Sequence, residues 1–128
     1  DSKHFSHNML EIIKSNPELK FIAFSPPVTS EMHCLIKKTG LEKQYEQWIK
    51  DIINVFGTIH HFEYIHSVSK NRSNFMDANH FYPETGTMLV NRLQGTEAEK
   101  SSDFGIIISR ENLDDKLDFL RRNFEECK

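Results

Sequence analysis

The chain has 128 residues, of which 38% are hydrophobic and 27% are charged, a composition that suits one globular domain and excludes a disordered tail. With 16 Lys and Arg against 19 Asp and Glu, the net charge of −3 argues against a nucleic-acid-binding surface. No apolar run approaches the roughly 20 residues that cross a bilayer. The two cysteines, Cys34 and Cys127, form no CxxC pair, which disfavours a zinc ribbon.

The first third of the chain predicts a helix, a buried strand and a second helix. Apolar residues at 9, 12 and 13 mark a short helix that must stop near Asn16, because Pro17 disfavours helix in the residue before it. The continuous apolar run 21–24 (FIAF) predicts a strand buried on both faces. Ser30 could then cap a helix that extends to about Thr39.

The middle of the chain contains the clearest helical pattern. Apolar residues recur at steps of three and four from Leu41 to Phe56, and Gly57 is a typical residue just past a helix end. The sequence 39–42 (TGLE) has the spacing of a capping box for this helix. Residues 58–65 (TIHHFEYI) predict a strand, because β-branched and aromatic residues dominate them, and residues 67–80 predict a polar loop.

The last third predicts a helix, a strand and a final helix. Pro83 can open a short helix through Leu93, residues 104–108 (FGIII) form an apolar strand, and Asn112 can cap a helix that reaches Phe124. Strands separated by helices predict right-handed crossovers and a parallel sheet with helices on both faces, a three-layer α/β/α sandwich of flavodoxin-like type. Three strands are fewer than a typical sheet contains.

The loop after the second predicted strand carries the best candidate for chemistry. Ligands of open α/β sheets bind beyond the carboxyl ends of the strands. In this loop Asp77 and His80 are three positions apart, so the carboxylate can accept a hydrogen bond from one ring nitrogen while the other faces outward as a general base. The alternative is that Asp77 only caps the turn and His80 is a solvated residue.

Residues 74–93 (NFMDANHFYPETGTMLVNRL) resemble the C-terminal catalytic block of the SGNH/GDSL hydrolase superfamily, in the form found in bacterial envelope and polysaccharide-modifying proteins. That pattern has an aromatic residue, Asp-x-x-His, an aromatic pair, Pro-Glu-x-Gly and a helix that ends in a basic-apolar pair. The positions that match it are Asp77, His80, Phe81, Tyr82, Pro83, Glu84, Gly86, Arg92 and Leu93. Other parts agree more loosely, among them Ser25-Pro26-Pro27 and Phe104-Gly105.

The resemblance implies a serine-dependent esterase or acyltransferase of which residues 1–128 form the C-terminal portion. It implies a catalytic base at His80 and an orienting carboxylate at Asp77, acting without a cofactor on an acyl ester or a polysaccharide. The family's Gly-Asp-Ser block and its oxyanion-hole blocks are not found in this sequence, and Ser25, Ser30 and Ser109 lack the residues that flank such a nucleophile. The chain is therefore expected to be inactive alone, because the oxyanion donors supply much of the barrier lowering.

The resemblance further implies partners and a compartment. The N-terminal portion of the same domain would be one partner, and an uncovered sheet edge could also support a homodimer. A start at Asp1 without an initiator Met indicates processing, truncation or excision from a longer protein. Members of this variety often work outside the cytoplasm, which favours a periplasmic or envelope location. The alternative function is a non-catalytic binding or assembly module with an SGNH-like fold.

Two further groups of residues are interpreted as structural rather than functional. His60, His61 and His66 do not have the helical spacing of a zincin site, so exposed histidines at strand ends are expected and no metal. Cys34 is expected to be a buried structural thiol and Cys127 an exposed one, although a bridge between them is possible.

Overall fold

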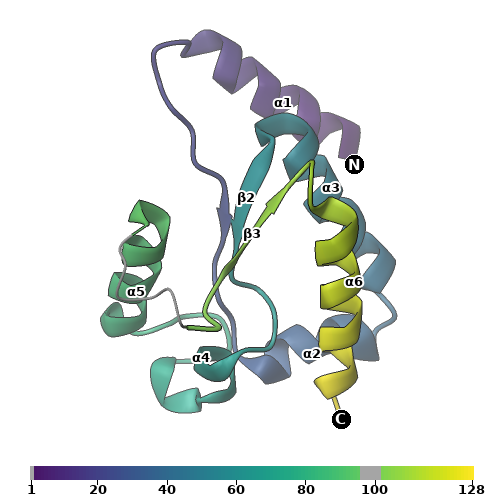
Figure 1. Ribbon diagram of the computed structural model, residues 1–128, viewed down its shortest axis with the longest axis vertical. Coiled ribbons are helices and arrows are strands. Elements are labelled where there is room, and N and C mark those ends of the chain that lie inside the picture. Colours follow the sequence, from purple (N-terminus) through teal and green to yellow (C-terminus); the bar gives the residue numbers. More distant parts are fainter. Residues whose placement is uncertain (1, 96–101) are drawn as a thin grey trace.

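The computed structural model describes residues 2–95 and 102–128 and shows a mixed α/β fold (Figure 1). Its elements in chain order are α1 (Ser2–Ser15), β1 (Phe24–Ser25), α2 (Ser30–Lys38), α3 (Glu42–Phe56), β2 (Thr58–His61), α4 (Ser67–Lys70), η1 (Arg72–Asn74), α5 (Pro83–Gln94), β3 (Ile106–Ser109), α6 (Leu113–Asn123) and η3 (Phe124–Glu126). Within these residues, no helix combines the length and the apolar character that crossing a membrane requires.

The sheet has the order β1-β2-β3 and is not fully parallel. β1 lies parallel to β2, with Phe24 opposite His60, whereas β3 lies antiparallel to β2, with Ile108 opposite Ile59. The prediction of an all-parallel sheet is therefore wrong for β3. An antiparallel strand at the edge of an otherwise parallel sheet is common in α/β proteins.

The direction of β3 follows from how the chain is anchored just before it. The hydroxyl of Tyr64, three residues past β2, accepts the N–H of Gly105 at 3.0 Å and donates to the carbonyl of Asp103. β3 therefore begins at the end of the sheet where β2 finishes, and it must run back along β2. Gly105 suits this position, because its φ of +92° and the closeness of the Phe62 ring leave no room for a side chain.

One face of the sheet carries the main core. Ile59 and Ile108 point from the sheet toward α3 and α6, where they pack with Ile49, Ile53 and Leu120. α1 packs on the outside of α3 (Figure 1). A second, smaller cluster of Phe62, Val68, Leu89 and Phe104 attaches α4 and α5 to the end of the sheet.

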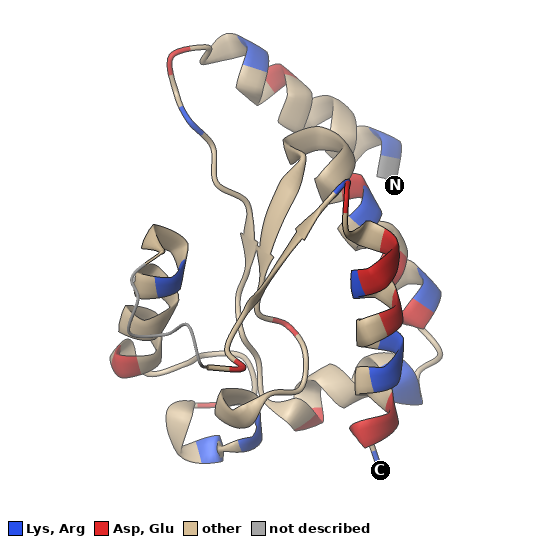
Figure 2. Cartoon of the chain, in the orientation of Figure 1, with Lys and Arg blue, Asp and Glu red and all other residues tan. Residues whose placement is uncertain are grey.

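The other face of the sheet and the free edge of β1 are only partly covered. Phe24 is 46% exposed and Ile107 is 51% exposed, and the extended segment before β1 also exposes Leu19, Phe21 and Ile22. The strands carry no charged residue, and the charges lie on the helices and loops instead (Figure 2). The molecule thus presents an apolar strand edge that charge does not protect.

Several predicted boundaries differ from the structure. The strand expected over 21–24 is only Phe24–Ser25, because β2 pairs with those two residues alone. The capping box over 39–42 does not form: the Thr39 hydroxyl donates back to the carbonyl of Leu35 at 2.6 Å and so closes α2. α2 is capped by Thr29 rather than Ser30, since the Thr29 hydroxyl accepts the N–H of Met32.

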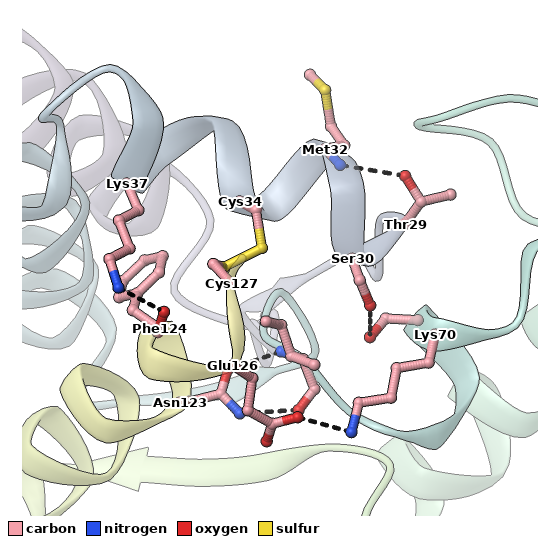
Figure 3. The surroundings of a disulfide bond; sticks show 12 residues. Thr29, Ser30, Met32, Cys34, Lys37, Lys70, Asn123, Phe124, Glu126 and Cys127 are labelled. Carbon is pink, nitrogen blue, oxygen red and sulfur yellow. Dashed lines mark hydrogen bonds and ion pairs between the residues drawn. A yellow bond between two sulfur atoms is a disulfide. The ribbon is translucent and has the colours of Figure 1, made fainter.

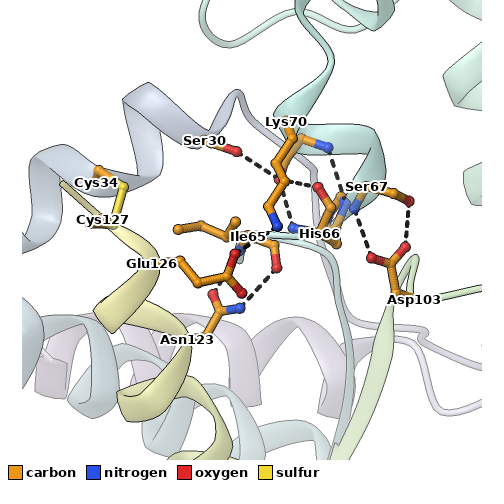
Figure 4. Close-up of polar contacts among 11 residues, drawn as sticks. Ser30, Cys34, Ile65, His66, Ser67, Lys70, Asp103, Asn123, Glu126 and Cys127 are labelled. Atoms are coloured by element: carbon orange, nitrogen blue, oxygen red, sulfur yellow. Dashed lines mark hydrogen bonds and ion pairs between the residues drawn. A yellow bond between two sulfur atoms is a disulfide. The ribbon is translucent and has the colours of Figure 1, made fainter.

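Cys34 and Cys127 form a disulfide, which replaces the expected free thiols (Figure 3). It joins the middle of α2 to the end of η3, over a sequence separation of 93 residues. Noncovalent contacts reinforce it: Lys37 Nζ donates to the carbonyl of Phe124 at 3.0 Å, and the Asn123 side chain bonds both the N–H and the carbonyl of Ile65 (Figure 4). The C-terminal turn is thereby fixed to α2 and to the segment after β2.

Candidate acid–base site

The structure brings Asp77 and His80 together as the sequence predicts. His80 Nδ1 lies 2.8 Å from Asp77 Oδ1 and 2.7 Å from Oδ2. A carboxylate can only accept, so Nδ1 carries the proton and donates it. The lone pair of the neutral ring is then on Nε2, and this nitrogen has no hydrogen-bond partner among the described residues. The arrangement is that of a general base steadied by a carboxylate.

Backbone donors hold the carboxylate in its ionised form. Asp77 Oδ1 accepts the N–H of Asn79 at 2.8 Å and that of His80 at 2.9 Å. The bond from Asn79, followed by the imidazole of His80, lowers the pKa of Asp77 below its usual value. Both side chains are accessible, with 68% of the His80 side chain and 59% of the Asp77 side chain exposed. The pair is thus preorganised and open to solvent.

A closed turn fixes the two residues. Phe75 pairs with Phe81 across it, the N–H of Met76 donates to the carbonyl of His80 at 2.7 Å, and that of Tyr82 donates to the carbonyl of Asn74 at 2.9 Å. Pro83 then starts α5 at its first position, as predicted. These bonds tie the turn to itself independently of the Asp77–His80 contact.

Two small features anchor this turn to the rest of the fold. Thr29, at the start of α2, donates both its N–H and its hydroxyl to the carbonyl of Ala78, at 3.0 and 3.2 Å. A Cβ added at Gly86 would lie 3.2 Å from the ring of Phe81, so the glycine makes room for that ring against α5. The Thr29 contact has no local signal in the sequence, because its partner lies 49 residues away.

A hollow of about 330 Å³ adjoins Asp77. It is lined by Thr29, Glu31, Arg72, Phe75, Met76, Asp77 and Ala78. Arg72 Nε donates to Glu31 Oε1 at 2.7 Å, which ties η1 to α2 beside the hollow. The hollow combines apolar walls with a charged rim next to the acid–base pair.

Asp103 holds the segment that follows β2 at the start of α4 (Figure 4). Its carboxylate accepts the N–H of Ser67 at 2.8 Å and the Ser67 hydroxyl at 2.5 Å, which fixes the start of α4. The ring of His66 caps the same helix by accepting the N–H of Ser69 at 3.2 Å. His66 is therefore buried, contrary to the expectation of an exposed histidine.

His61 is also buried rather than exposed, in a chain of hydrogen bonds that fixes its protonation. The Tyr45 hydroxyl donates to the carbonyl of Glu63 at 2.7 Å, so its oxygen accepts from His61 Nε2 at 2.6 Å. Nδ1 is then an acceptor, and the Ser25 hydroxyl donates to it at 2.8 Å. Burial, with the nearby His33, lowers the pKa of His61 to about 3. The imidazole therefore stays neutral and joins β1, β2 and α3.

The serines at positions 25, 30 and 109 make no hydrogen bond to His80. Ser25 is fully buried in the His61 chain, and Ser30 bonds Ser69 across the start of α2 at 3.1 Å. The N–H of Ser109 donates to the Asn112 side chain at 2.8 Å. No group of three His, Cys, Asp or Glu side chains that could hold a metal ion occurs in residues 2–95 and 102–128.

Comparisons of the chain with protein-family models, with curated proteins and with solved structures give no match.

Proposed function

We propose that Asp77 and His80 are the acid–base pair of a serine-dependent esterase or acyltransferase of SGNH type. The observation that carries this proposal is that Nδ1 of His80 lies within hydrogen-bond distance of both carboxylate oxygens of Asp77, while its Nε2 has no hydrogen-bond partner among the described residues. In such a site His80 removes the proton of the nucleophilic hydroxyl and returns it to the leaving group, while Asp77 stabilises the imidazolium that forms.

The nucleophile and the oxyanion donors are supplied from outside this chain in the proposal. Within the described residues, no serine hydroxyl hydrogen-bonds to Nε2 of His80, and Ser25 is fully buried, with its hydroxyl bonded to His61. The uncovered edge of β1 offers a place for a preceding strand of the same domain. With such strands added, the sheet would become a parallel three-layer α/β/α sandwich in which β3 is the antiparallel edge strand. The same edge could instead pair two copies of the chain.

The resemblance over residues 74–93 supports an acyl ester or an acylated polysaccharide as the substrate. The disulfide supports a location outside the cytoplasm, because such bonds persist mainly in oxidising compartments.

The test is an ester hydrolysis assay with the parent protein that contains the preceding sequence. His80→Ala is expected to lower the turnover of a short p-nitrophenyl ester by about 10³-fold or more, and Asp77→Asn by a comparable factor. His7→Ala, an exposed histidine on α1, is the matched control and should leave turnover unchanged. Equal activity of the wild type and His80→Ala would refute the proposal.

The second candidate is a binding or assembly module that retains the fold without catalysis. The uncovered strand edge and the exposed Phe24 and Ile107 favour it, because such surfaces associate readily. A parent protein that folds, lacks a Gly-Asp-Ser-like block and hydrolyses no ester would support this candidate.

A further inference from the structure

A second hollow lies away from Asp77, between the end of α2, the start of α3 and the residues that follow β2. It has a volume of about 270 Å³ and is lined by Ile36, Leu41, Gln44, Tyr45, Trp48 and Glu63. Four of these side chains are aliphatic or aromatic, with polar groups only at the Tyr45 hydroxyl and the Trp48 indole N–H, whereas Gln44 and Glu63 end in fully polar groups. The acid–base site uses none of them.

The carboxylate of Glu63 has no partner within residues 2–95 and 102–128. Its side chain makes no hydrogen bond and no ion pair among the described residues, although it is largely withdrawn from water. Burial raises the pKa of this carboxyl to about 7, and no neighbouring cation opposes the shift. A half-buried carboxylate without a protein partner is incompletely solvated, so it would attract a cation placed in the hollow.

The aromatic rings of the hollow add to this attraction. Trp48 and Tyr45 stand next to each other, with ring centroids 6.2 Å apart and planes tilted by 38°. A cation near an indole ring is stabilised by the ring's quadrupole, most of all when water is excluded. The carboxylate and the rings therefore favour the same kind of ligand, a positively charged one.

The small number of hydrogen-bond acceptors in the hollow favours some cations over others. A primary ammonium brings three N–H donors, each of which needs an acceptor. The Tyr45 hydroxyl is already committed to His61 and to the carbonyl of Glu63, which leaves the carboxylate and Gln44. A quaternary ammonium has no N–H donors and presents methyl groups to Ile36, Leu41 and the rings, so it leaves nothing unsatisfied.

We propose that the hollow formed by Ile36, Leu41, Gln44, Tyr45, Trp48 and Glu63 binds a quaternary ammonium group of the trimethylammonium type. Glu63 neutralises its charge, and Trp48 contacts its methyl groups. This site is independent of the Asp77–His80 pair, and its presence does not require that the chain belong to a hydrolase.

The test uses Trp48, the only tryptophan of the chain, as the reporter. Choline chloride is titrated into the protein at pH 8, where Glu63 is ionised, and the fluorescence is compared with titrations of sodium chloride and of 3,3-dimethyl-1-butanol, the uncharged isostere of choline. Saturable binding of choline alone is expected, weakened by about fivefold or more in Glu63→Gln. Glu18→Gln, the same change at an exposed loop position, is the matched control and should bind as the wild type does.

Equal binding of choline and its neutral isostere would overturn the proposal, as would unchanged affinity in Glu63→Gln. Choline-induced chemical-shift changes at the Trp48 indole N–H provide a second measurement if the fluorescence does not respond, and their absence also overturns it. Cosedimentation with phosphatidylcholine vesicles, lost in Glu63→Gln, would identify a lipid headgroup as the source. Choline binding without cosedimentation would identify a soluble ligand.

Discussion

The buried histidines predict that the fold loses stability in mild acid. His61 and His33 are 0% and 1% exposed, and burial lowers their pKa values to about 3 and about 4. The unfolded chain takes up protons near the ordinary histidine pKa of about 6.5, whereas the folded protein does not. Stability from these groups is therefore fully present above that pH and is lost as the pH falls toward 4.

The size of the effect follows from the proton linkage. At pH 5 each neutral histidine costs about 2 kcal/mol, set by the 1.5 units between that pH and the unfolded pKa of about 6.5, so the pair costs about 4 kcal/mol. Glu63 opposes this loss, since its raised pKa of about 7 contributes stability in acid that disappears as the pH rises through 7. Its contribution between pH 7 and pH 5 is about 2 kcal/mol.

The assay is urea unfolding at pH 7, 6 and 5, followed by Trp48 fluorescence. Between pH 7 and pH 5, Glu63→Gln is expected to lose about 2 kcal/mol more than the wild type loses. His33→Leu should reduce the loss by about 2 kcal/mol, because it removes one of the two histidines. It also removes a buried Nδ1 that has no hydrogen-bond partner among the described residues. Equal pH dependence in the wild type, Glu63→Gln and His33→Leu would refute the reasoning.

Three further predictions concern individual contacts. Tyr45→Phe leaves the His61 Nε2–H and the Glu63 carbonyl without a partner, and thermal unfolding should show a loss of about 1–3 kcal/mol. Replacing Cys34 and Cys127 together by Ser should destabilise the fold by about 2–5 kcal/mol in urea titrations, and added dithiothreitol should lower the wild type to the same value without affecting the variant. Gly86→Ala places a methyl group 3.2 Å from the Phe81 ring, which must move by a few tenths of an ångström, and should therefore shift the NMR signals of His80. Thr87→Ala, on the exposed side of α5, should leave these signals unchanged, and an unshifted His80 in Gly86→Ala would contradict the packing argument.

The sequence predicted those features that depend on neighbouring residues. The apolar stripe from Leu41 to Phe56 became α3 because its period matches a helix, and Gly57 ends it with a φ of +81°. Asp77 and His80 meet because they lie three positions apart in a tight turn. Periodicity and short spacing are local properties, and they can be read directly from a sequence.

The features that were missed depend on partners far along the chain. An apolar run such as 106–108 does not encode its direction, so β3 was expected to be parallel although Tyr64 anchors it the other way. His61 is buried because Ser25 and Tyr45, 36 and 16 residues away, satisfy both of its ring nitrogens. The bridge between Cys34 and Cys127 spans 93 residues, a separation that carries no signal in a chain with two cysteines.

The Cys34–Cys127 bond divides the chain into a covalent ring and a free arm. The second half of α2 and the elements from α3 to η3 lie within the ring. α1, β1 and the first turn of α2 lie outside it, attached through the backbone at Cys34 and held against the ring only by noncovalent contacts. A molecule stretched by its two ends under oxidising conditions could therefore extend by little more than the residues before Cys34, about 110 Å at roughly 3.4 Å per residue. The sheet would lose β1 first, while β2 and β3 would be shielded from the force.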